Sequence, residues 1–333
     1  MDRIAIIGLG LIGGSLGLAL KAAKLKDIEI VGADMDRDTV LQAKKRGAVD
    51  GTERLPEVAV RGAGLVIVAT PLLAMPEVFQ AIAPNLMEAA VVSDTGSTKD
   101  QVMKWAAEYL PPHVDFVGGH PMAGKETSGI SGAEATLFKD SLYCVVPAPT
   151  ASKGAVNLIL GIVQSIGALP YFVSADEHDV LVGGISHLPL VLAAALMAMV
   201  DRNPSWDEMS KLASSGFRDA SRLASSDAAL SRGITLTNQH SLLHWLDEYM
   251  AVLREYRKLL VDDVDGFAEA LSKARDSRDL WLAKLSSGER ERLLSDVPTV
   301  SEHMMEMFLG GRLSQLMRQQ EKQMDDMEKK HRR

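Results

Sequence analysis

Short apolar runs alternate with helical patterns through the first half of the chain. The runs are rich in β-branched residues and are continuous, without the apolar–polar alternation of a half-exposed strand. Strands of this kind are typical of a parallel sheet between two layers of helices. We therefore expect strands at residues 4–7, 28–33, 65–69, 90–93, 116–118 and 142–146.

Helix signals occupy the segments between these strands. Residues 12–23 indicate one helix, and a polar helix follows the second strand. That second helix carries Lys44, Lys45 and Arg46 in its last turn and ends at Gly47, as helix C-termini commonly do. The alternation predicts an α/β fold whose N-terminal domain is a Rossmann-type, doubly wound and mostly parallel sheet.

The pattern changes near residue 173, after which only helices are expected. We divide the chain into a dinucleotide-binding domain, residues 1–173, and an all-helical domain, residues 174–333, for substrate binding and dimerisation. Alanine- and methionine-rich faces in the second domain indicate packing between helices. The expected helices are 176–202, 206–215, 236–260, 266–284 and 302–330, the last of which ends in a polar tail.

The composition is that of an ordinary globular protein, with 47% hydrophobic and 24% charged residues. Thirty-six basic and 44 acidic residues give a net charge of −8. An acidic balance argues against nucleic acid as a partner, because phosphate contacts need clustered Lys and Arg. Any anionic substrate must be held by a few local cations.

Two apolar stretches resemble membrane or signal segments. Residues 4–20 contain five glycines, which make a poor hydrophobic helix, and residues 188–200 are too short to cross a bilayer. We therefore expect no membrane partner. The one cysteine, Cys144, has no internal disulfide partner, so the cytoplasm is the expected location.

The segment from Gly8 to Gly13 has the spacing G-x-G-x-x-G, with Gly10 between them. It follows a predicted strand and opens a predicted helix, the context of a dinucleotide-binding loop. Gly8 allows the tight turn, Gly10 lets the backbone approach the pyrophosphate, and Gly13 lets helix and strand pack closely. The amides of the helix start, at Leu11 and Ile12, would then face the phosphates.

Asp34 lies 21 residues after Gly13, at the end of the second predicted strand. A carboxylate there suits the two ribose hydroxyls of NAD and repels the 2′-phosphate of NADP. Arg37 is the one nearby cation that could favour NADP, although it suits an exposed helix start equally. Thr70 and Pro71 follow the third strand, where the cofactor would lie along the strand ends.

A histidine, His120, lies among glycines and a proline in residues 118–129. This segment follows a strand, so we expect a loop near the cofactor crevice. The residues alone are compatible with a catalytic histidine, a surface histidine or a partner of a helix start.

Five segments resemble the prephenate and arogenate dehydrogenases of tyrosine biosynthesis. The motifs are the glycine loop at 8–13, DTGSTK at 94–99, GHPMAG at 119–124, SHLP at 186–189 and GFRDASRLA at 216–224, the last followed by Ser226 and Asp227. They occur in the family's order over about residues 3–260. The resemblance implies an NAD-dependent oxidative decarboxylation of prephenate to 4-hydroxyphenylpyruvate by a homodimer.

The resemblance also implies roles for single residues. His120 matches the general base that takes the 4-hydroxyl proton, and Ser97 matches a serine at the same hydroxyl. His187, Arg222 and Glu126 match substrate-binding residues. For Ser97 an N-cap of the helix from residue 99 is an equally good interpretation, and Glu126 suits an exposed loop acid.

Two neighbours of these residues are expected to have other roles. His178 lies nine residues before His187, about half a turn out of phase on a helix, so we expect it to face away and to be structural. Pro189 should kink this helix. Arg218 shares a helix face with Arg222, but we expect it to form a surface ion pair.

Two departures from the family pattern leave the substrate open. Leu190 replaces a histidine, and residues 228–231 lack an aromatic side chain. Two other substrates are therefore alternatives to prephenate: arogenate, or a prephenate with an amino substituent. A dinucleotide-sensing regulator without catalytic activity is a third alternative. The glycine-rich segment around His120 argues against a sensor, because a sensor needs no general base.

No metal site is expected. His240 and His244 are spaced like ligands but lack a third one, so we place them on a solvated face. Cys144 suits a small core residue. The methionines of residues 304–327 suit a seam between helices or subunits.

Overall fold

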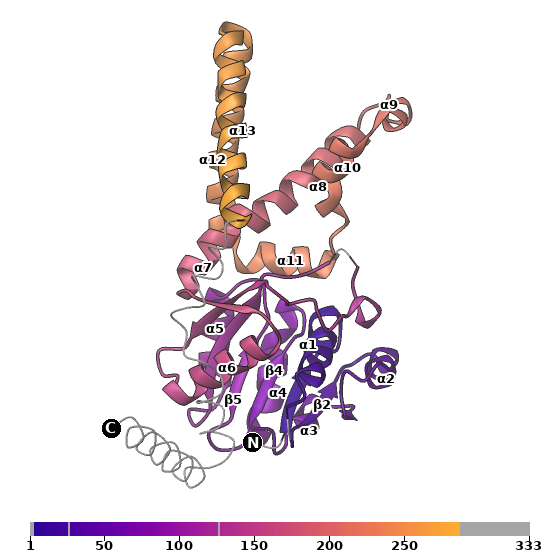
Figure 1. The fold of residues 1–333 in the computed structure, drawn as a ribbon, viewed down its shortest axis with the longest axis vertical. Helices are drawn as coiled ribbons and strands as arrows, with labels where there is room; N and C mark the ends of the chain where they lie inside the picture. The colour runs from indigo at the N-terminus through magenta and orange to yellow at the C-terminus, as the bar shows by residue number, and fades with distance from the viewer. Residues whose placement is uncertain (1–2, 26, 126, 287–333) are drawn as a thin grey trace, which may run out of the picture.

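The structure, a computed structural model, describes residues 3–25, 27–125 and 127–286. Its first half is one eight-stranded sheet in the order β3-β2-β1-β4-β5-β6-β7-β8 (Figure 1). Neighbouring strands run parallel, except that β6 pairs antiparallel with β7. The strands are β1 (Arg3–Ile7), β2 (Glu29–Ala33), β3 (Gly51–Glu53), β4 (Leu65–Val68), β5 (Val91–Asp94), β6 (Asp115–Pro121), β7 (Leu142–Pro147) and β8 (Leu169–Phe172).

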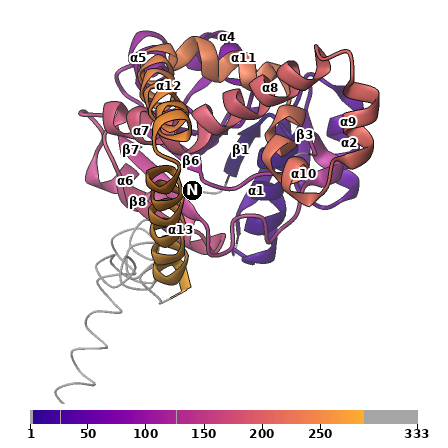
Figure 2. The same ribbon diagram turned by 90° about the horizontal axis from the view of Figure 1, so that it is seen from above.

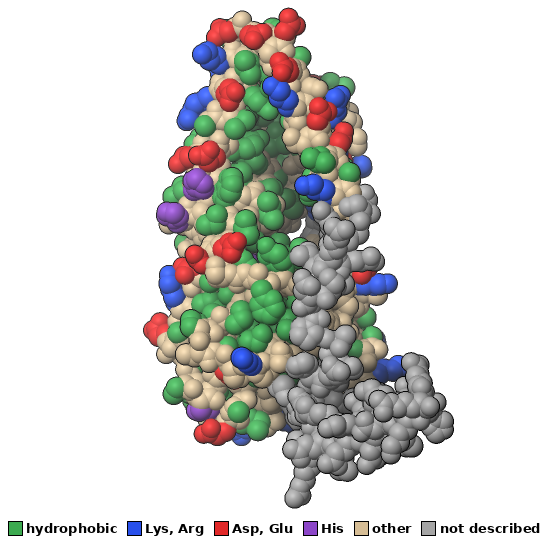
Figure 3. Space-filling view, turned by 60° about the vertical axis from the view of Figure 1, so that its left-hand side comes forward, with side chains coloured by type: hydrophobic (Ala, Val, Ile, Leu, Met, Phe, Trp, Pro, Cys, Tyr) green, Lys and Arg blue, Asp and Glu red, His purple; other side chains and the backbone are tan. Residues whose placement is uncertain are grey.

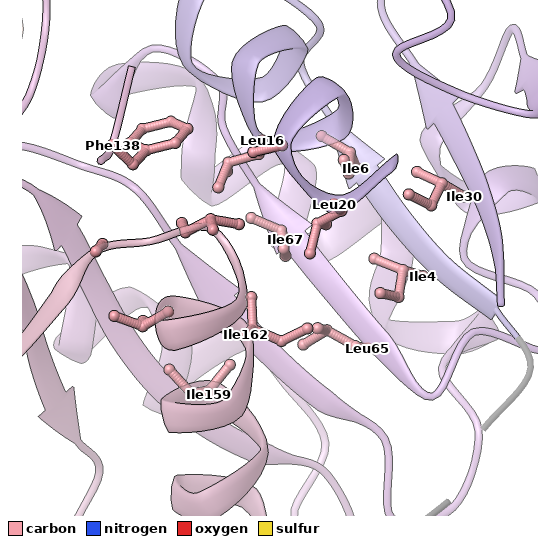
Figure 4. Close-up of a cluster of buried hydrophobic side chains, with 14 of the residues drawn as sticks. Ile4, Ile6, Leu16, Leu20, Ile30, Leu65, Ile67, Phe138, Ile159 and Ile162 are labelled. Atoms are coloured by element: carbon pink, nitrogen blue, oxygen red, sulfur yellow. The ribbon is translucent and has the colours of Figure 1, made fainter. Parts of the chain in front are cut away.

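Both faces of this sheet are apolar, because alternate side chains of each strand point to opposite layers. Ile4 and Ile6 of β1 pack with α1 (Leu11–Ala22) and α6 (Lys153–Ser165), as Figure 4 shows. Ala5 and Ile7 pack on the other face. That face is covered by α3 (Pro56–Ala59), α4 (Met75–Ile82) and α5 (Asp100–Tyr109), while α2 (Arg37–Lys45) follows β2. The doubly wound, mostly parallel sheet is confirmed.

Three details of the sheet differ from expectation. The edge strands β3 and β8 are additional: β3 (GTE) has no apolar run, and the short run of β8 (LPYF) is interrupted by Pro170. Strand β6 continues to Pro121, so His120 lies in a strand and the expected loop position is wrong. The reason is the antiparallel partner β7, which pairs His120 with Cys144 and holds the segment in the sheet.

The second half of the described chain is helical. Helix α7 (Ala175–Val182) continues through η4, a π-helical stretch (Gly183–His187), into α8 (Leu188–Asp201). The expected helix 206–215 ends at Leu212, a separate helix begins at Ser215, and the helix Ala228–Thr237 was not expected from the sequence. The remaining elements are α9 (Trp206–Leu212), α10 (Ser215–Ser221), η5 (Arg222–Ser225), α11 (Ala228–Thr237), α12 (Gln239–Asp262) and α13 (Val264–Ser286). The expected helix 302–330 lies outside the described residues, as do the methionines of 304–327.

The helices of the second half form two arms above the sheet (Figures 1 and 2). Helices α12 and α13 pack along each other in one arm, and α8 leads to α9 and α10 in the other. Helix α11 lies across the sheet domain and contacts η1 (Leu72–Ala74). This arrangement leaves large apolar side chains exposed, among them Met199, Val252, Leu260, Val261 and Trp281. Figure 3 shows hydrophobic side chains gathered along the upper part of the molecular face that is turned toward the viewer.

One helix is long and apolar enough to span a membrane, by length and composition only. Residues 175–201 form 27 continuous helical residues, and the most apolar part of this helix has a mean hydropathy of 2.1 and is 28% buried. The expectation that this apolar stretch is too short is therefore corrected, because α7 and η4 extend α8. The beginning of this helix, however, packs against the sheet domain through α5.

Candidate active site

The glycine loop between β1 and α1 is shaped by close backbone contacts. Gly8 has a φ of +94°, and a Cβ there would lie 2.5 Å from the carbonyl oxygen of Ala69. A Cβ on Gly13 would lie 1.9 Å from the carbonyl oxygen of Gly8, so only glycine lets α1 approach the loop. A Cβ on Gly10 would meet nothing within 4 Å. The backbone at Gly10 is therefore open to a ligand.

Helix α1 begins at this open position without a side-chain cap. Gly10 is its N-cap residue and makes no side-chain hydrogen bond to the first turn. Leu11 and Ile12 form that turn, where amide groups and the helix dipole favour an anion. The loop and the helix start together fit a pyrophosphate.

Asp34 follows β2 and lies against the same loop. Its Oδ2 accepts a hydrogen bond from the amide of Leu9 at 2.7 Å, and its Oδ1 accepts one from the amide of Asp36 at 2.9 Å. A carboxylate has about four acceptor sites, so it can also accept from ribose hydroxyls. Asp34 thus fits an adenosine ribose.

The segment after β4 also fits a bound cofactor. The Oγ1 of Thr70 is buried and has no hydrogen-bond partner among the described residues. A buried hydroxyl without a partner is uncommon, and a ligand atom would supply one. Pro71 is exposed beside it.

The turn after β5 holds a buried ion pair. The side chains of Asp94 and Lys99 are fully buried and pair with each other. Asp94 also accepts hydrogen bonds from the amides of Gly96, at 2.7 Å, and Gly119, at 3.1 Å. Lys99 Nζ donates to the carbonyl oxygen of Gly119 at 2.6 Å. The pair therefore ties this turn to β6, directly before His120.

His120 is the first member of a chain of three buried side chains. Its Nδ1 lies 2.9 Å from Nε2 of His178, and Nδ1 of His178 lies 2.8 Å from Oδ1 of Asp179. An ionised carboxylate only accepts hydrogen bonds, so Nδ1 of His178 carries the proton and, in the neutral ring, its Nε2 accepts. Nδ1 of His120 must then donate, which leaves the lone pair of His120 on Nε2. This is the tautomer that a general base requires.

The expectation that His178 faces away from the site is wrong. It assumed about 100° per residue between His178 and His187, which places the two half a turn apart. In η4, however, the amide of Leu188 bonds to the carbonyl of Gly183, five residues earlier. A π-helical turn takes up one extra residue, so the two histidines are separated by only about 80°. Both are 1% exposed.

His187 has the opposite proton arrangement. The Nδ2 of Asn238 donates to the main-chain oxygen of Asp179 at 2.7 Å and lies 3.1 Å from Nδ1 of His187. Because Nδ2 is a donor, Nδ1 of His187 accepts, and the proton of the neutral ring is on Nε2. That Nε2 is buried and has no partner in hydrogen-bonding geometry among the described residues, although the ring interacts with the main chain of Ser97. His187 therefore offers an N–H donor to a ligand.

Both of these histidines are held neutral at neutral pH. Burial is the main cause that lowers the pKa of His120 well below 6.5, and His178, Lys99 and His187 lower it further. Burial also lowers the pKa of His187 to about 4, although the charge of Asp179 opposes this shift. The neutral form is the one that can accept a proton at His120 and donate a hydrogen bond at His187.

Ser97 is half-buried in the turn between Asp94 and Lys99. The expected N-cap role is wrong, because α5 begins at Asp100 and takes its cap from another element. Asp179 of α7 accepts hydrogen bonds from the amides of Lys99, at 2.7 Å, and Asp100, at 3.0 Å. The carboxylate thus replaces the usual local capping side chain.

Arg222 is the other described residue for which the family motif implies substrate binding. Arg222 is exposed and begins η5. This element packs against α8, the helix that follows His187. Arg218 is 80% exposed, 4.0 Å from Asp219, and so forms the expected surface ion pair. Glu126 lies outside the described residues.

The other sequence features have ordinary structural explanations. Leu190 packs against the core cluster on the α4–α5 face. Residues 228–231 open α11, which Asp227 caps through the amides of residues 229 and 230. Cys144 is buried in a small apolar cluster, as expected. His240 and His244 are exposed, and the part of the chain described contains no group of three possible metal ligands.

Sequence reasoning missed three contributors to the site. Asp179 and Asn238 set the proton positions of the histidines, and Lys99 supplies a buried charge. The adjacent pair His178 and Asp179 was a usable signal, because a carboxylate and a histidine that enter a long apolar stretch need partners once they are buried. Asn238 carried no signal in the sequence.

Removing the Asp179 carboxylate should strongly destabilise the fold. Asp179→Ala leaves the buried amide of Lys99, the half-buried amide of Asp100 and one buried imidazole N–H without an acceptor. We expect a loss of about 2–4 kcal/mol in the free energy of unfolding. Asp179→Asn keeps one oxygen and should lose less. Urea unfolding at pH 7.5 measures both. Asp176→Asn, an exposed change on the same helix, is the control and should stay within about 0.5 kcal/mol.

Acid should destabilise the protein through the neutral histidines. The pKa of His187 is about 4 in the fold and 6.5 as a free side chain, and the pKa of His120 is also lowered. The unfolded chain therefore binds more protons below pH 6.5, so this stability is present above that pH and is lost as the pH falls. Each histidine contributes a slope of up to about 1.4 kcal/mol per pH unit.

Urea unfolding at pH 7.5, 6.5 and 5.5 tests this slope. His187→Asn should flatten it, whereas His240→Asn, on an exposed face of α12, should not. Equal slopes in wild type and His187→Asn would contradict the assignment.

Comparison with known proteins agrees with this geometry. The family model "Prephenate dehydrogenase, nucleotide-binding domain" matches residues 16–171, and "Prephenate dehydrogenase, dimerization domain" matches residues 174–273. The prephenate dehydrogenase of Bacillus subtilis is 33% identical over 281 residues, which are 84% of this chain and 76% of that protein.

Two solved structures extend the similarity to the fold. The prephenate dehydrogenase of Aquifex aeolicus, in complex with hydroxyphenyl propionate and NAD+, has a TM-score of 0.78 and 26% identity over 84% of this chain and 97% of that one. Synechocystis arogenate dehydrogenase has a TM-score of 0.71 and 28% identity, covering 84% and 99%. The chain therefore belongs to the prephenate dehydrogenase family.

Proposed function

We propose that this protein catalyses the NAD-dependent oxidative decarboxylation of prephenate to 4-hydroxyphenylpyruvate in tyrosine biosynthesis. The observation that carries this proposal is the buried chain from Asp179 through His178 to His120, which leaves the acceptor of His120 on Nε2. His120 lies near the carboxyl end of β6, and β6 runs parallel to β5. The carboxyl ends of such strands form the crevice in which dinucleotides bind.

The residues around the glycine loop would hold NAD. Gly8, Gly10 and Gly13 admit the pyrophosphate, Leu11 and Ile12 offer amides to it, and Asp34 accepts from the ribose hydroxyls. Thr70 and Pro71 border the path toward the nicotinamide. NADP is less favourable because its 2′-phosphate would approach the Asp34 carboxylate. When bound, the nicotinamide supplies the acceptor for the hydride that leaves the substrate ring.

His120 acts on the 4-hydroxyl of the substrate in this proposal. Its Nε2 takes the hydroxyl proton while the hydride leaves the ring carbon that bears this hydroxyl. Ser97 orients the hydroxyl. The C–C bond to the ring carboxylate then breaks, carbon dioxide departs, and the electron pair completes the aromatic ring. The proton on Nε2 can return to the oxygen, because the product is a phenol. His178 and Asp179 hold the imidazole in the required tautomer.

The substrate's side chain and carboxylates would be held by three further residues. His187 donates from Nε2, the buried atom without a partner in hydrogen-bonding geometry among the described residues. Arg222 supplies a guanidinium that can bind a carboxylate through two hydrogen bonds. Glu126, outside the described residues, is proposed from the family motif alone.

The quaternary structure and location follow from the same proposal. The match to a dimerization domain and the exposed apolar side chains of α8, α12 and α13 support a homodimer. The single cysteine supports a cytoplasmic location. We also propose that the domains divide at residues 173 and 174, between β8 and α7.

An assay with two substrates and two cofactors tests this function. Absorbance at 340 nm would be followed for prephenate and arogenate, each with NAD and NADP. Prephenate with NAD should give the highest kcat/KM. Arogenate as the preferred substrate would move the protein to the arogenate dehydrogenases, an amino-substituted prephenate would move it to specialised metabolism, and no turnover with any pair would favour a dinucleotide sensor.

Loss of the base should lower turnover without affecting cofactor binding. His120→Asn removes the titrating group, and we expect kcat to fall by about 10²–10⁴. The affinity for NAD, measured by fluorescence titration, should change little, because the glycine loop lies on other strands. A kcat near the wild-type value would remove His120 from the mechanism.

The two arginines should differ in their effect on substrate use. Arg222→Gln should reduce kcat/KM for prephenate at least about tenfold, since a charge-assisted hydrogen bond contributes roughly 1.5–3 kcal/mol. Arg218→Gln, the matched control in an exposed pair, should change it little. Lysine at position 222 should restore activity only in part. A large KM effect at Arg218 alone would show that the wrong arginine was chosen.

A further inference from the structure

The helix that carries His178 and His187 changes register at one turn, and this turn is held from outside the site. Helix α12 packs against η4. From α12, Trp245 donates its indole Nε1–H to the carbonyl oxygen of Val180 at 2.8 Å. In an unbroken α-helix that carbonyl would pair with the amide of Gly184, four residues later. The indole thus bonds to α7 shortly before the π-helical stretch, which begins at Gly183.

Two adjacent glycines make room for the same indole. A Cβ on Gly184 would lie 2.8 Å from Cε2 of Trp245, and a Cβ on Gly183 would lie 3.1 Å from its Cδ1. Glycine is unfavourable in a helix interior, by about 1 kcal/mol relative to alanine. Its presence twice at this turn is explained by the ring that lies against it.

We propose that Trp245, seated on Gly183 and Gly184, is a positioning residue that fixes the π-helical register and thereby places both His178 and His187 in the site. The hydrogen bond from the indole favours the π-helical turn over a regular α-helix, in which the two histidines would lie about half a turn apart. In this proposal Trp245 acts through the helix, by its contacts with Val180, Gly183 and Gly184. This inference rests on the proposed function for its catalytic consequence.

A positioning role differs from a purely structural one in what it changes. The groups packed around His120 are Asp94 and Lys99 before α5, Tyr143 and Cys144 of β7, and His178, Asp179 and His187 of the register-shifted helix. If the register relaxes, His178 and His187 move away while the other groups remain. Water then reaches His120, and because burial is the main cause that lowers the pKa of His120, this pKa rises toward its ordinary value. Loss of general stability would not produce this change.

Trp245→Phe is the decisive variant, because it keeps a ring on the glycines and removes the donor. We expect kcat for prephenate to fall about tenfold to a hundredfold, because small displacements of catalytic groups are costly. The acid limb of the kcat/KM profile should move to higher pH, and KM for NAD should stay within about twofold. Trp206→Phe, on α9, is the matched control and should keep wild-type kinetics.

A measurement without substrate separates this inference from the proposed function. Hydrogen exchange followed by mass spectrometry should show faster exchange in Trp245→Phe, confined to peptides that cover residues 180–188. If the wild type turns over none of the substrates, the proposed function fails, yet the exchange result still tests the register. If the wild type is active and Trp245→Phe matches it in kcat, pH profile and exchange, the inference is overturned.

A double-mutant cycle tests the role of the glycines. Gly184→Ala pushes a methyl group into the indole and should lower kcat by a similar factor, whereas Gly154→Ala in α6, where the nearest atom would be 3.7 Å away, should not. In a Trp245→Leu background the ring is absent, so Gly184→Ala should add little further loss. Fully additive losses would show that Gly184 and Trp245 act independently and would overturn their joint role.

Discussion

The site depends on the hydrogen bonds of the Asp179 carboxylate, because they join the helical half of the molecule to the sheet domain. Its two oxygens accept from the amides of Lys99 and Asp100, and one of them also accepts from His178. Its main-chain oxygen accepts from Asn238. The same residue therefore caps α5 of the sheet domain, orients the base and fixes the amide that orients His187. The two halves cannot shift against each other without breaking the proton arrangement of both histidines.

The electrostatics of the site favour neutral groups over charged ones. Lys99 is fully buried, and its charge is compensated by Asp94 but still opposes a proton on His120. A protonated His187 would oppose it further. With both rings neutral, His120 can accept a proton and His187 can donate a hydrogen bond. In the proposed reaction, His120 takes the hydroxyl proton while His187 binds the anionic substrate. In a chain of net charge −8, full positive charge is left to an exposed guanidinium such as that of Arg222.

The parts of this structure that were predictable from sequence are those set by local or strictly periodic rules. Continuous apolar runs located six strands, and the spacing of Gly8, Gly10 and Gly13 located a loop whose shape excludes a Cβ at two of the three. The errors arose where a distant partner decides. The strand that contains His120 is extended by β7, and Ser97 loses its capping role to a carboxylate 82 residues away. The predicted direction of His178 was wrong because one turn of the helix contains an extra residue. A prediction that assumes about 100° per residue throughout the helix does not include such a turn.

A single helical phase could not satisfy both ends of the long helix. Its first part must turn His178 and Asp179 toward the sheet domain, where their partners are His120 and the start of α5. Its last part, α8, packs against η5 and α10 and carries apolar side chains such as Met199 to the surface. One extra residue in η4 rotates the second part by about 100° relative to the first, so each part meets its own partners. That rotation also places His187 on the same side of the helix as His178. The π-helical turn would weaken an isolated helix, but here it brings the residues of the site together.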